Sequence, residues 1–208
     1  MTYYWARFED RNGDMFRFDT RIYLQPIEMP SCTDDVCIGA IIGKNPGSAR
    51  PSCNSTTLQP IRLGNDKLLP TVKSIMLRAH DRAGIMPNNN QRKYIQVLNL
   101  FYLCDEVFHN AKRRIQKFSP SHPICCSENK TFDFIFYAWG GPNDGINSFK
   151  RRFTNNPKTN NHIWYDYRQK KTKNIAPDEN DFAKHPQGLR HEFIVPGIVE
   201  VLQNSSMV

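Results

Sequence analysis

The sequence lacks any long apolar run. Of its 208 residues 39% are hydrophobic, but no stretch approaches the roughly 20 apolar residues that a membrane-spanning helix needs. The first 14 residues, MTYYWARFEDRNGD, also lack the apolar core of a signal peptide. We therefore expect a globular cytoplasmic protein without a membrane partner. Its length suits a single domain over residues 1–208.

Metal-ligand motifs are missing as well. The six cysteines stand at positions 32, 37, 53, 104, 125 and 126, and no two of them form a Cys-x-x-Cys pair. This spacing fits neither a zinc site nor an iron–sulfur cluster. We predict free thiols in a reducing compartment, with no metal ion and no other cofactor.

Acidic residues are fewer than basic ones. The chain has 28 Lys and Arg against 20 Asp and Glu, which gives a formal charge of +8. Basic residues cluster at 112–114, 150–152 and 168–173. A clustered positive surface favours a polyanion partner, and nucleic acid is the commonest one. The same excess could serve solubility alone.

Strand and helix patterns alternate along the chain. The Asn12-Gly13 turn between two aromatic-rich runs predicts a hairpin over residues 3–25, and residues 26–36 and 49–66 read as loops. Apolar runs predict strands at 37–43, 94–101, 132–139 and 162–167. Helices are expected over 68–84, 104–117, 143–154 and 193–202.

This alternation is typical of an α/β fold. We expect a three-layer αβα arrangement around a central, mostly parallel four-stranded sheet in residues 37–202, preceded by the hairpin and loop of residues 1–36. Sites in such sheets lie at the carboxyl ends of the strands. Those ends carry Asn45-Pro46-Gly47, Asn99, Gly140-Gly141 and the loop that holds His185.

Four short motifs at these strand ends resemble the uracil-DNA glycosylase superfamily. The first motif, Gly43-Lys44-Asn45-Pro46-Gly47, is most similar to the strand end of the mismatch-specific and thymine-DNA glycosylases. It is followed by Val97-Leu98-Asn99-Leu100, by Ala138-Trp139-Gly140 and by His185-Pro186-Gln187-Gly188-Leu189. The motifs stand in the order of the family, and the resemblance covers about residues 37–202.

The resemblance implies a monofunctional DNA N-glycosylase, which flips a base out of the duplex and hydrolyses its glycosidic bond. In that family Asn45 would position the attacking water and His185 would donate a hydrogen bond to the departing pyrimidine. Asn99 would pair with the edge of the flipped base. Each residue also has an ordinary structural interpretation: Asn45 as a turn amide, Asn99 as a strand-end amide and His185 as a loop histidine.

Further positions follow from the same resemblance. Leu189 falls where the family has an intercalating leucine, and we expect Gln187, Arg190, Lys170 and Lys171 to contact DNA. The stacking ring that the family places after the first motif is missing, because no Phe, Tyr or Trp lies between Asn45 and Arg92. The remaining candidates are Phe101, Tyr102 and Tyr137 for stacking and Asp66 for activating the water.

Gly47 stands where uracil-specific members have a tyrosine that blocks substituents at carbon 5. Without that tyrosine the pocket is expected to be open. In this respect the chain resembles antiviral glycosylases that remove glucosylated hydroxymethylcytosine from phage DNA and leave abasic sites. We therefore expect a 5-substituted pyrimidine in DNA as substrate and a monomeric enzyme. Three alternatives stay open: a repair glycosylase for uracil or mismatched thymine, a non-enzymatic nucleic-acid-binding module of the same fold, and a hydrolase of free nucleotides or nucleosides.

Overall fold

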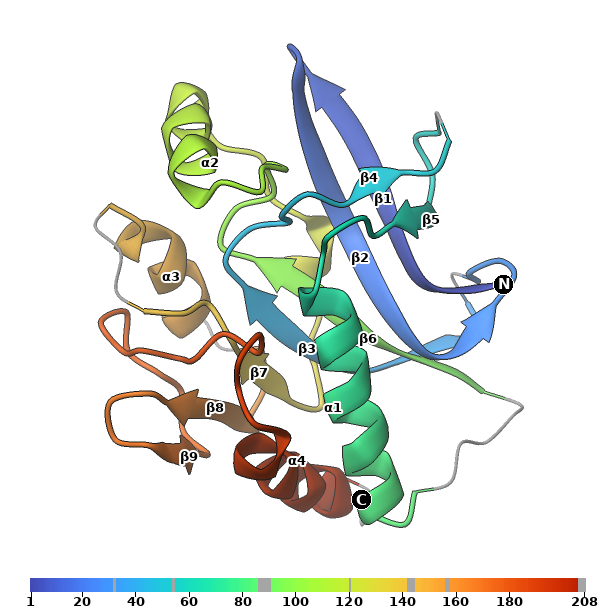
Figure 1. Ribbon diagram of the computed structural model, residues 1–208, viewed down its shortest axis with the longest axis vertical. Helices are drawn as coiled ribbons and strands as arrows, with labels where there is room; N and C mark the ends of the chain where they lie inside the picture. Colours follow the sequence, from blue (N-terminus) through green and yellow to red (C-terminus); the bar gives the residue numbers. More distant parts are fainter. Residues whose placement is uncertain are drawn as a thin grey trace.

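The structure, a computed structural model, describes residues 1–31, 33–53, 55–85, 91–119, 121–141, 145–155 and 158–205 (Figure 1). Its strands are β1 (Thr2–Arg11), β2 (Asp14–Ile27), β3 (Asp35–Gly43), β4 (Arg50–Pro51), β5 (Gln59–Arg62), β6 (Arg92–Asn99), β7 (Ile135–Tyr137), β8 (His162–Asp166) and β9 (Lys171–Lys173). Its helices are α1 (Leu68–Arg82), α2 (Phe108–Ile115), α3 (Asn147–Thr154) and α4 (His191–Ser205), with 3-10 turns at Gln116–Phe118 and Cys126–Asn129. Over these ranges no helix combines the length and the apolar character needed to span a bilayer.

The α/β class is confirmed, but the sheet is larger than the mostly parallel, four-stranded one that we predicted. Over the described ranges it has nine strands in the order β4-β5-β1-β2-β6-β3-β7-β8-β9. Five of the eight strand pairings among these residues are antiparallel, and three are parallel. The parallel pairings join β6, β3, β7 and β8 in the middle, and antiparallel strands extend them on both sides.

The N-terminal hairpin is confirmed, and it accounts for much of this difference. Asn12 and Gly13 have φ values of 56° and 79°, as the two central residues of a type I′ turn require. Its second strand, β2, pairs antiparallel with β6, for example Thr20 with Val97. The segment that we expected to precede the core is therefore part of the main sheet.

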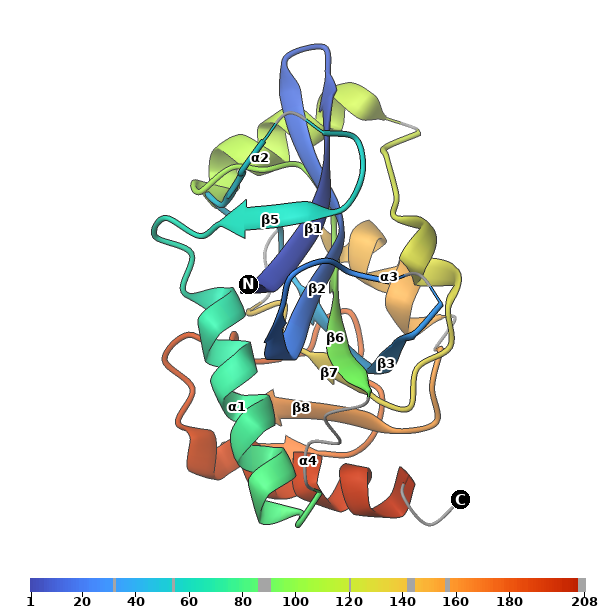
Figure 2. The ribbon, with the colours of Figure 1, turned by 90° about the vertical axis from the view of Figure 1, so that its right-hand side faces the viewer.

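Helices pack on both faces of the sheet. Strand β3 shows why, since its apolar run lets alternate residues point to opposite faces. Ile41 joins the cluster that contains the apolar residues of α1 and α4, whereas its neighbours Ala40 and Ile42 join the cluster of α2 and α3. Helices α1 and α4 lie against each other in both views (Figures 1 and 2).

The parallel strands bring their carboxyl ends to one edge of the sheet. Gly43 at the end of β3 pairs with Asn99 at the end of β6, and Ile42 pairs with Tyr137 at the end of β7. Beyond Gly43 the chain turns through residues 44–48, which carry the first sequence motif.

Candidate functional site

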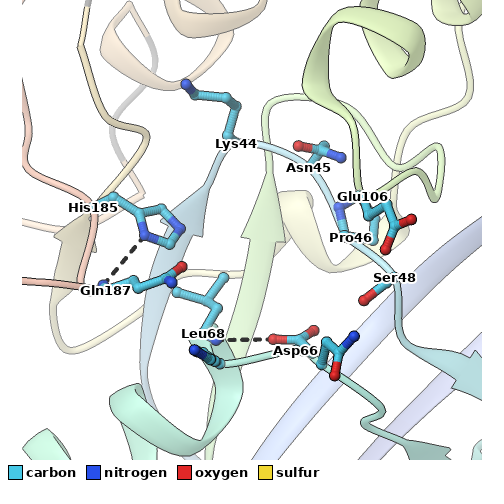
Figure 3. A pocket seen from close by; sticks show the side chains of 12 residues that line it. Lys44, Asn45, Pro46, Ser48, Asp66, Leu68, Glu106, His185 and Gln187 are labelled. Carbon is cyan, nitrogen blue, oxygen red and sulfur yellow. Dashed lines mark hydrogen bonds between the residues drawn. The ribbon is translucent and has the colours of Figure 1, made fainter.

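A cavity of about 330 Å³ opens at the carboxyl end of β3 (Figure 3). Its walls come from the loop after β3, the entry to α1, the loop after β6 and the segment before α4. They consist of Lys44, Asn45, Pro46, Gly47, Ser48, Asn65, Asp66, Lys67, Leu68, Glu106, His185 and Gln187. The volume lies at the lower end of the range of small-ligand sites, roughly 300–1,000 Å³. Of the residues predicted for function, Asn45, Gly47, Asp66, His185 and Gln187 meet here.

The loop at Gly47 is open toward the cavity. A Cβ atom built on this glycine would meet only the Oδ2 atom of Asp66, at 4.0 Å. Gly47 also has a φ of +69°, in the left-handed region that favours glycine over residues with a side chain. The backbone conformation alone therefore favours glycine at this position. The resemblance implies a second cause, which is room for a substituent at carbon 5 of the base.

Asn45 has a fixed orientation at this cavity. Its Nδ2 atom donates a hydrogen bond to the backbone carbonyl of Asp105, with an N···O distance of 2.8 Å. This contact commits the amide nitrogen to the protein. The Oδ1 atom is then the end of the side chain that can accept a hydrogen bond from a water molecule or a ligand.

His185 is held as a hydrogen-bond donor. The backbone N–H of Gln187 donates to its Nδ1 atom over 3.2 Å, so the neutral ring carries its proton on Nε2. Burial, and next the positive charge of Lys44, lower the pKa of His185 to about 4, while Asp66 acts in the opposite direction. At neutral pH the ring is therefore uncharged.

Lys44 has no assigned role in the sequence prediction, although it lies inside the first motif. Its Nζ atom lies 4.5 Å from the centroid of the Phe108 ring and 3.4 Å from the position that a Cβ on Gly140 would take. Burial lowers the pKa of Lys44. Glu106 also lines the cavity, and no sequence signal pointed to it, because only the fold brings the loop after β6 to this edge.

The Asp66 carboxylate is already engaged. Its Oδ1 atom accepts hydrogen bonds from the backbone N–H groups of Leu68 at 2.9 Å and Leu69 at 3.3 Å, the first two residues of α1. Its Oδ2 atom forms an ion pair with Arg17 at 3.3 Å. Both oxygens thus have protein partners that tie the loop to α1 and β2, and activation of the water by Asp66 stays a prediction.

Asn99 lies at the end of β6, beside Gly43 at the end of β3. Its side chain is fully buried, and neither Oδ1 nor Nδ2 has a hydrogen-bond partner among the described residues. A Cβ on Gly43 would be only 3.1 Å from the Oδ1 atom of Asn99. A buried amide without partners costs free energy, so this side chain is a candidate to pair with a ligand that enters from the strand ends.

Three further predicted residues lie in the core, outside the described lining of the cavity. Phe101 is fully buried and packs on Phe108 and Phe149, and the Tyr137 hydroxyl lies 3.0 Å from the Nδ1 atom of His162. Leu189 is 6% exposed, in the cluster with α1 and α4. Base stacking by Phe101 and Tyr137, and strand intercalation by Leu189, therefore stay predictions.

The basic residues predicted to contact DNA are on the surface. Lys170 and Lys171 are exposed where β8 turns into β9. Arg190 is exposed before α4, where it pairs with Glu192 at 2.6 Å. Within the described ranges, His, Cys, Asp and Glu side chains form no group of three or more that could hold a metal ion.

Comparisons with known proteins leave the family open. No protein-family model, curated protein or solved structure significantly matches this chain. The similarity to the uracil-DNA glycosylases therefore rests on the four motifs at the strand ends. What the site does has to be argued from its own geometry and chemistry.

Proposed function

We propose that the chain is a DNA glycosylase that hydrolyses the N-glycosidic bond of a flipped pyrimidine. The observation that carries this proposal is the meeting of Asn45 and His185 at one cavity. Each comes from a different segment, and each is held by a backbone contact that leaves one useful atom for a ligand. Asn45 offers an acceptor in Oδ1, and His185 offers a donor in Nε2–H.

These two atoms suit the reaction. When the glycosidic bond breaks, its electrons leave with the base, so the sugar gains positive and the base negative charge. Asn45 would hold the water whose oxygen bonds to C1′ of the sugar, and the proton that this water loses ends on the departing base. His185 would donate to the base where negative charge develops, an interaction worth about 3–4 kcal/mol in a site without bulk water.

Asn99 adds a means of recognising the base. Its amide has one acceptor and two donor hydrogens, which match the hydrogen-bonding edge of a pyrimidine. The lack of any partner for this buried amide among the described residues supports such a role. A base that pairs with Asn99 would satisfy the amide and would enter at the ends of β3 and β6.

For the substrate we propose a 5-substituted pyrimidine, such as the glucosylated hydroxymethylcytosine of phage DNA, in antiviral defence. The open space beside Gly47 supports a substituent at carbon 5. Because the backbone at Gly47 itself favours glycine, a substitution there would strain the loop whatever the substrate. Substrates, rather than Gly47 variants, therefore distinguish this proposal from a uracil repair enzyme.

The test is to incubate the protein with three DNAs: plain, uracil-containing, and phage DNA with glucosylated hydroxymethylcytosine. Released base is measured by mass spectrometry, and abasic sites by cleavage in alkali. We expect release from the phage DNA and a fall of about 10²–10³-fold in Asn45→Ala. Asn65→Ala is the matched control, because it removes another amide that lines the cavity.

Each other outcome has a defined meaning. Release from the uracil DNA alone would make the protein a repair glycosylase. Binding of all three DNAs without release would favour a nucleic-acid-binding module. Activity on free nucleosides that does not fall with salt would point to a metabolic hydrolase, since DNA binding weakens steeply with salt.

A further inference from the structure

A second cavity, of about 430 Å³, lies between α1 and the start of α4. It is lined by Arg78, Arg82, Arg190, His191, Glu192 and Val195. Three of these six residues are arginines and one is a histidine, against a single carboxylate. We call this surface the basic groove.

Most of the positive charge in the basic groove is not neutralised by the protein. Arg190 forms an ion pair with Glu192, which accounts for the only carboxylate among the described lining residues. Arg78 and Arg82 are both exposed, and neither forms an ion pair within the described part of the chain. They stand four residues apart on α1, and residues at this spacing share one face of a helix.

The other wall of the basic groove carries a polar atom without a partner. This is the Nδ1 atom of His191, which is buried, has no partner in the described part of the structure and is a donor in the tautomer with its proton on Nδ1. Burial lowers the pKa of His191, and the charge of Arg78, which also lines the groove, lowers it further. Guanidinium groups around a concave surface match the geometry and charge of phosphate oxygens.

The basic groove is connected to the first cavity by two segments. Lys67 and Leu68 line the first cavity, and α1 runs from there to Arg78 and Arg82 (Figure 1). At 1.5 Å per residue, these arginines lie about 15 and 21 Å along the helix from Leu68. The second connection is the segment from His185 to Arg190, whose first residue lines one cavity and whose last lines the other.

We propose that the basic groove binds backbone phosphates of the DNA strand about four to six nucleotides from the base held in the first cavity. This separation follows from the distance along α1 and the 3.4 Å rise per nucleotide of one strand. The inference rests on the proposed function in taking DNA as the ligand. It does not depend on the bond that is cleaved or on the identity of the base.

The test compares two double variants that each remove two positive charges. Arg78→Gln/Arg82→Gln changes the basic groove. The control, Arg62→Gln/Arg92→Gln, changes arginines of β5 and β6 whose side chains donate to the carbonyls of Ser52 and Met29. Binding to a 30-base-pair duplex is measured by fluorescence anisotropy over a series of salt concentrations.

The logarithm of the association constant falls as salt rises. We expect this dependence to become less steep in the groove variant, with a slope smaller in magnitude by about 1.8, at about 0.9 for each lost phosphate contact. The control should keep the wild-type slope. A further set of duplexes carries a preferred base ten or three nucleotides from one end, and the set is repeated with the base near the other end. Where only three nucleotides extend toward the groove, the strand is too short to reach it. Wild type and groove variant should then bind with equal slopes.

Four results would overturn the proposal. An unchanged slope in the groove variant would show that no phosphate is bound there. An equal change of slope in the control would mean that the effect comes from the lower net charge alone. A groove variant that loses binding to acidic phospholipid vesicles but keeps the DNA slope would assign the surface to a membrane. A wild-type protein that binds no DNA would overturn the proposed function as well, which separates the two failures.

Discussion

At the scale of single residues, Lys44 and His185 form a coupled pair at the cavity. Burial is the main cause of the low pKa of His185, and the charge of Lys44 is the next. We expect Lys44→Met to raise the pKa of His185 above about 4. The measurement is an NMR titration of the histidine rings, with the His185 signal assigned by its loss in His185→Gln.

Lys184→Met is the control for that titration. Its charge also lowers the pKa of His185, but it ranks below Lys44 among the causes. The shift in Lys184→Met should therefore be smaller than the shift in Lys44→Met. Equal pKa values in wild type and Lys44→Met would show that the two groups are not coupled.

The low pKa of His185 also makes stability depend on pH. The ring takes up a proton near pH 6.5 in the unfolded chain but only near pH 4 in the folded one, so its contribution to stability is present above 6.5. As the pH falls from 6.5 toward 4, the unfolding free energy should decrease. Urea unfolding at pH 7 and pH 5 checks this, and the decrease should be smaller in His185→Gln, which does not titrate.

At the scale of elements, the Arg17–Asp66 ion pair joins β2 to the start of α1. The Arg17 side chain is fully buried, and that of Asp66 is 5% exposed. Arg17→Met would leave a buried carboxylate without its cation, so we expect the unfolding free energy to fall by about 3 kcal/mol. Urea unfolding is the measurement.

Adding Asp66→Asn should recover part of this loss, because the amide keeps an oxygen for the N–H groups of α1 but carries no charge. The double variant is therefore expected to be more stable than Arg17→Met alone. If Arg17→Met changed the unfolding free energy by less than about 0.5 kcal/mol, the Arg17–Asp66 pair would contribute no more to stability than an exposed ion pair does.

Helix α4 packs closely on the end of the sheet at Gly197. A Cβ at this position would lie 2.8 Å from the Cδ1 atom of Ile163 and 3.0 Å from the Cγ2 atom of Thr172. Alanine is the better helix former by about 1 kcal/mol, but overpacking costs about 1–3 kcal/mol. We expect Gly197→Ala to lower the melting temperature in a calorimetric scan. A rise would mean that α4 can move away from β8 without loss.

Elements whose signal is local could be predicted from sequence, whereas those that depend on distant partners could not. The Asn12-Gly13 turn and the apolar run of β3 have local causes, and both are found. Strand β5 lies within a predicted loop, because it forms by pairing with the distant residues Trp5 and Ala6 of β1 and with β4. Conversely, β7 is limited to Ile135–Tyr137, although the apolar pattern extends over 132–139.

The same distinction holds for the site. Asn45 and His185 could be predicted to meet at one edge, although β9 lies between β8 and His185. Asn45 follows β3. Bridges from Ala183 to Gly140 and Asp166 return the chain to the ends of β7 and β8. Phe101 was proposed to stack on a base, but an apolar pattern does not distinguish a core ring from a stacking one. The Arg17–Asp66 contact spans 49 residues of sequence, and no local pattern signals it.

At the scale of the whole molecule, the strands β1 and β2 are built into the main sheet. Strand β2 pairs with β6, and its residues Ile22 and Tyr23 are fully buried. We expect a fragment of residues 37–208 to lose cooperative thermal unfolding, measured by circular dichroism beside the full chain. A sharp transition in the fragment would show that the hairpin is a separate addition.

The lengths of the strands have a consequence for how copies of this chain meet at high concentration. The outermost strands β4 and β9 have only two and three residues, whereas β1 and β2 inside the sheet have 10 and 14. Short edges present few unpaired backbone groups, and Pro51 in β4 removes one donor more. Lys171 is exposed on β9 and adds a positive charge to that edge. A wide sheet thus ends in two borders that discourage strand addition and the aggregation that follows from it.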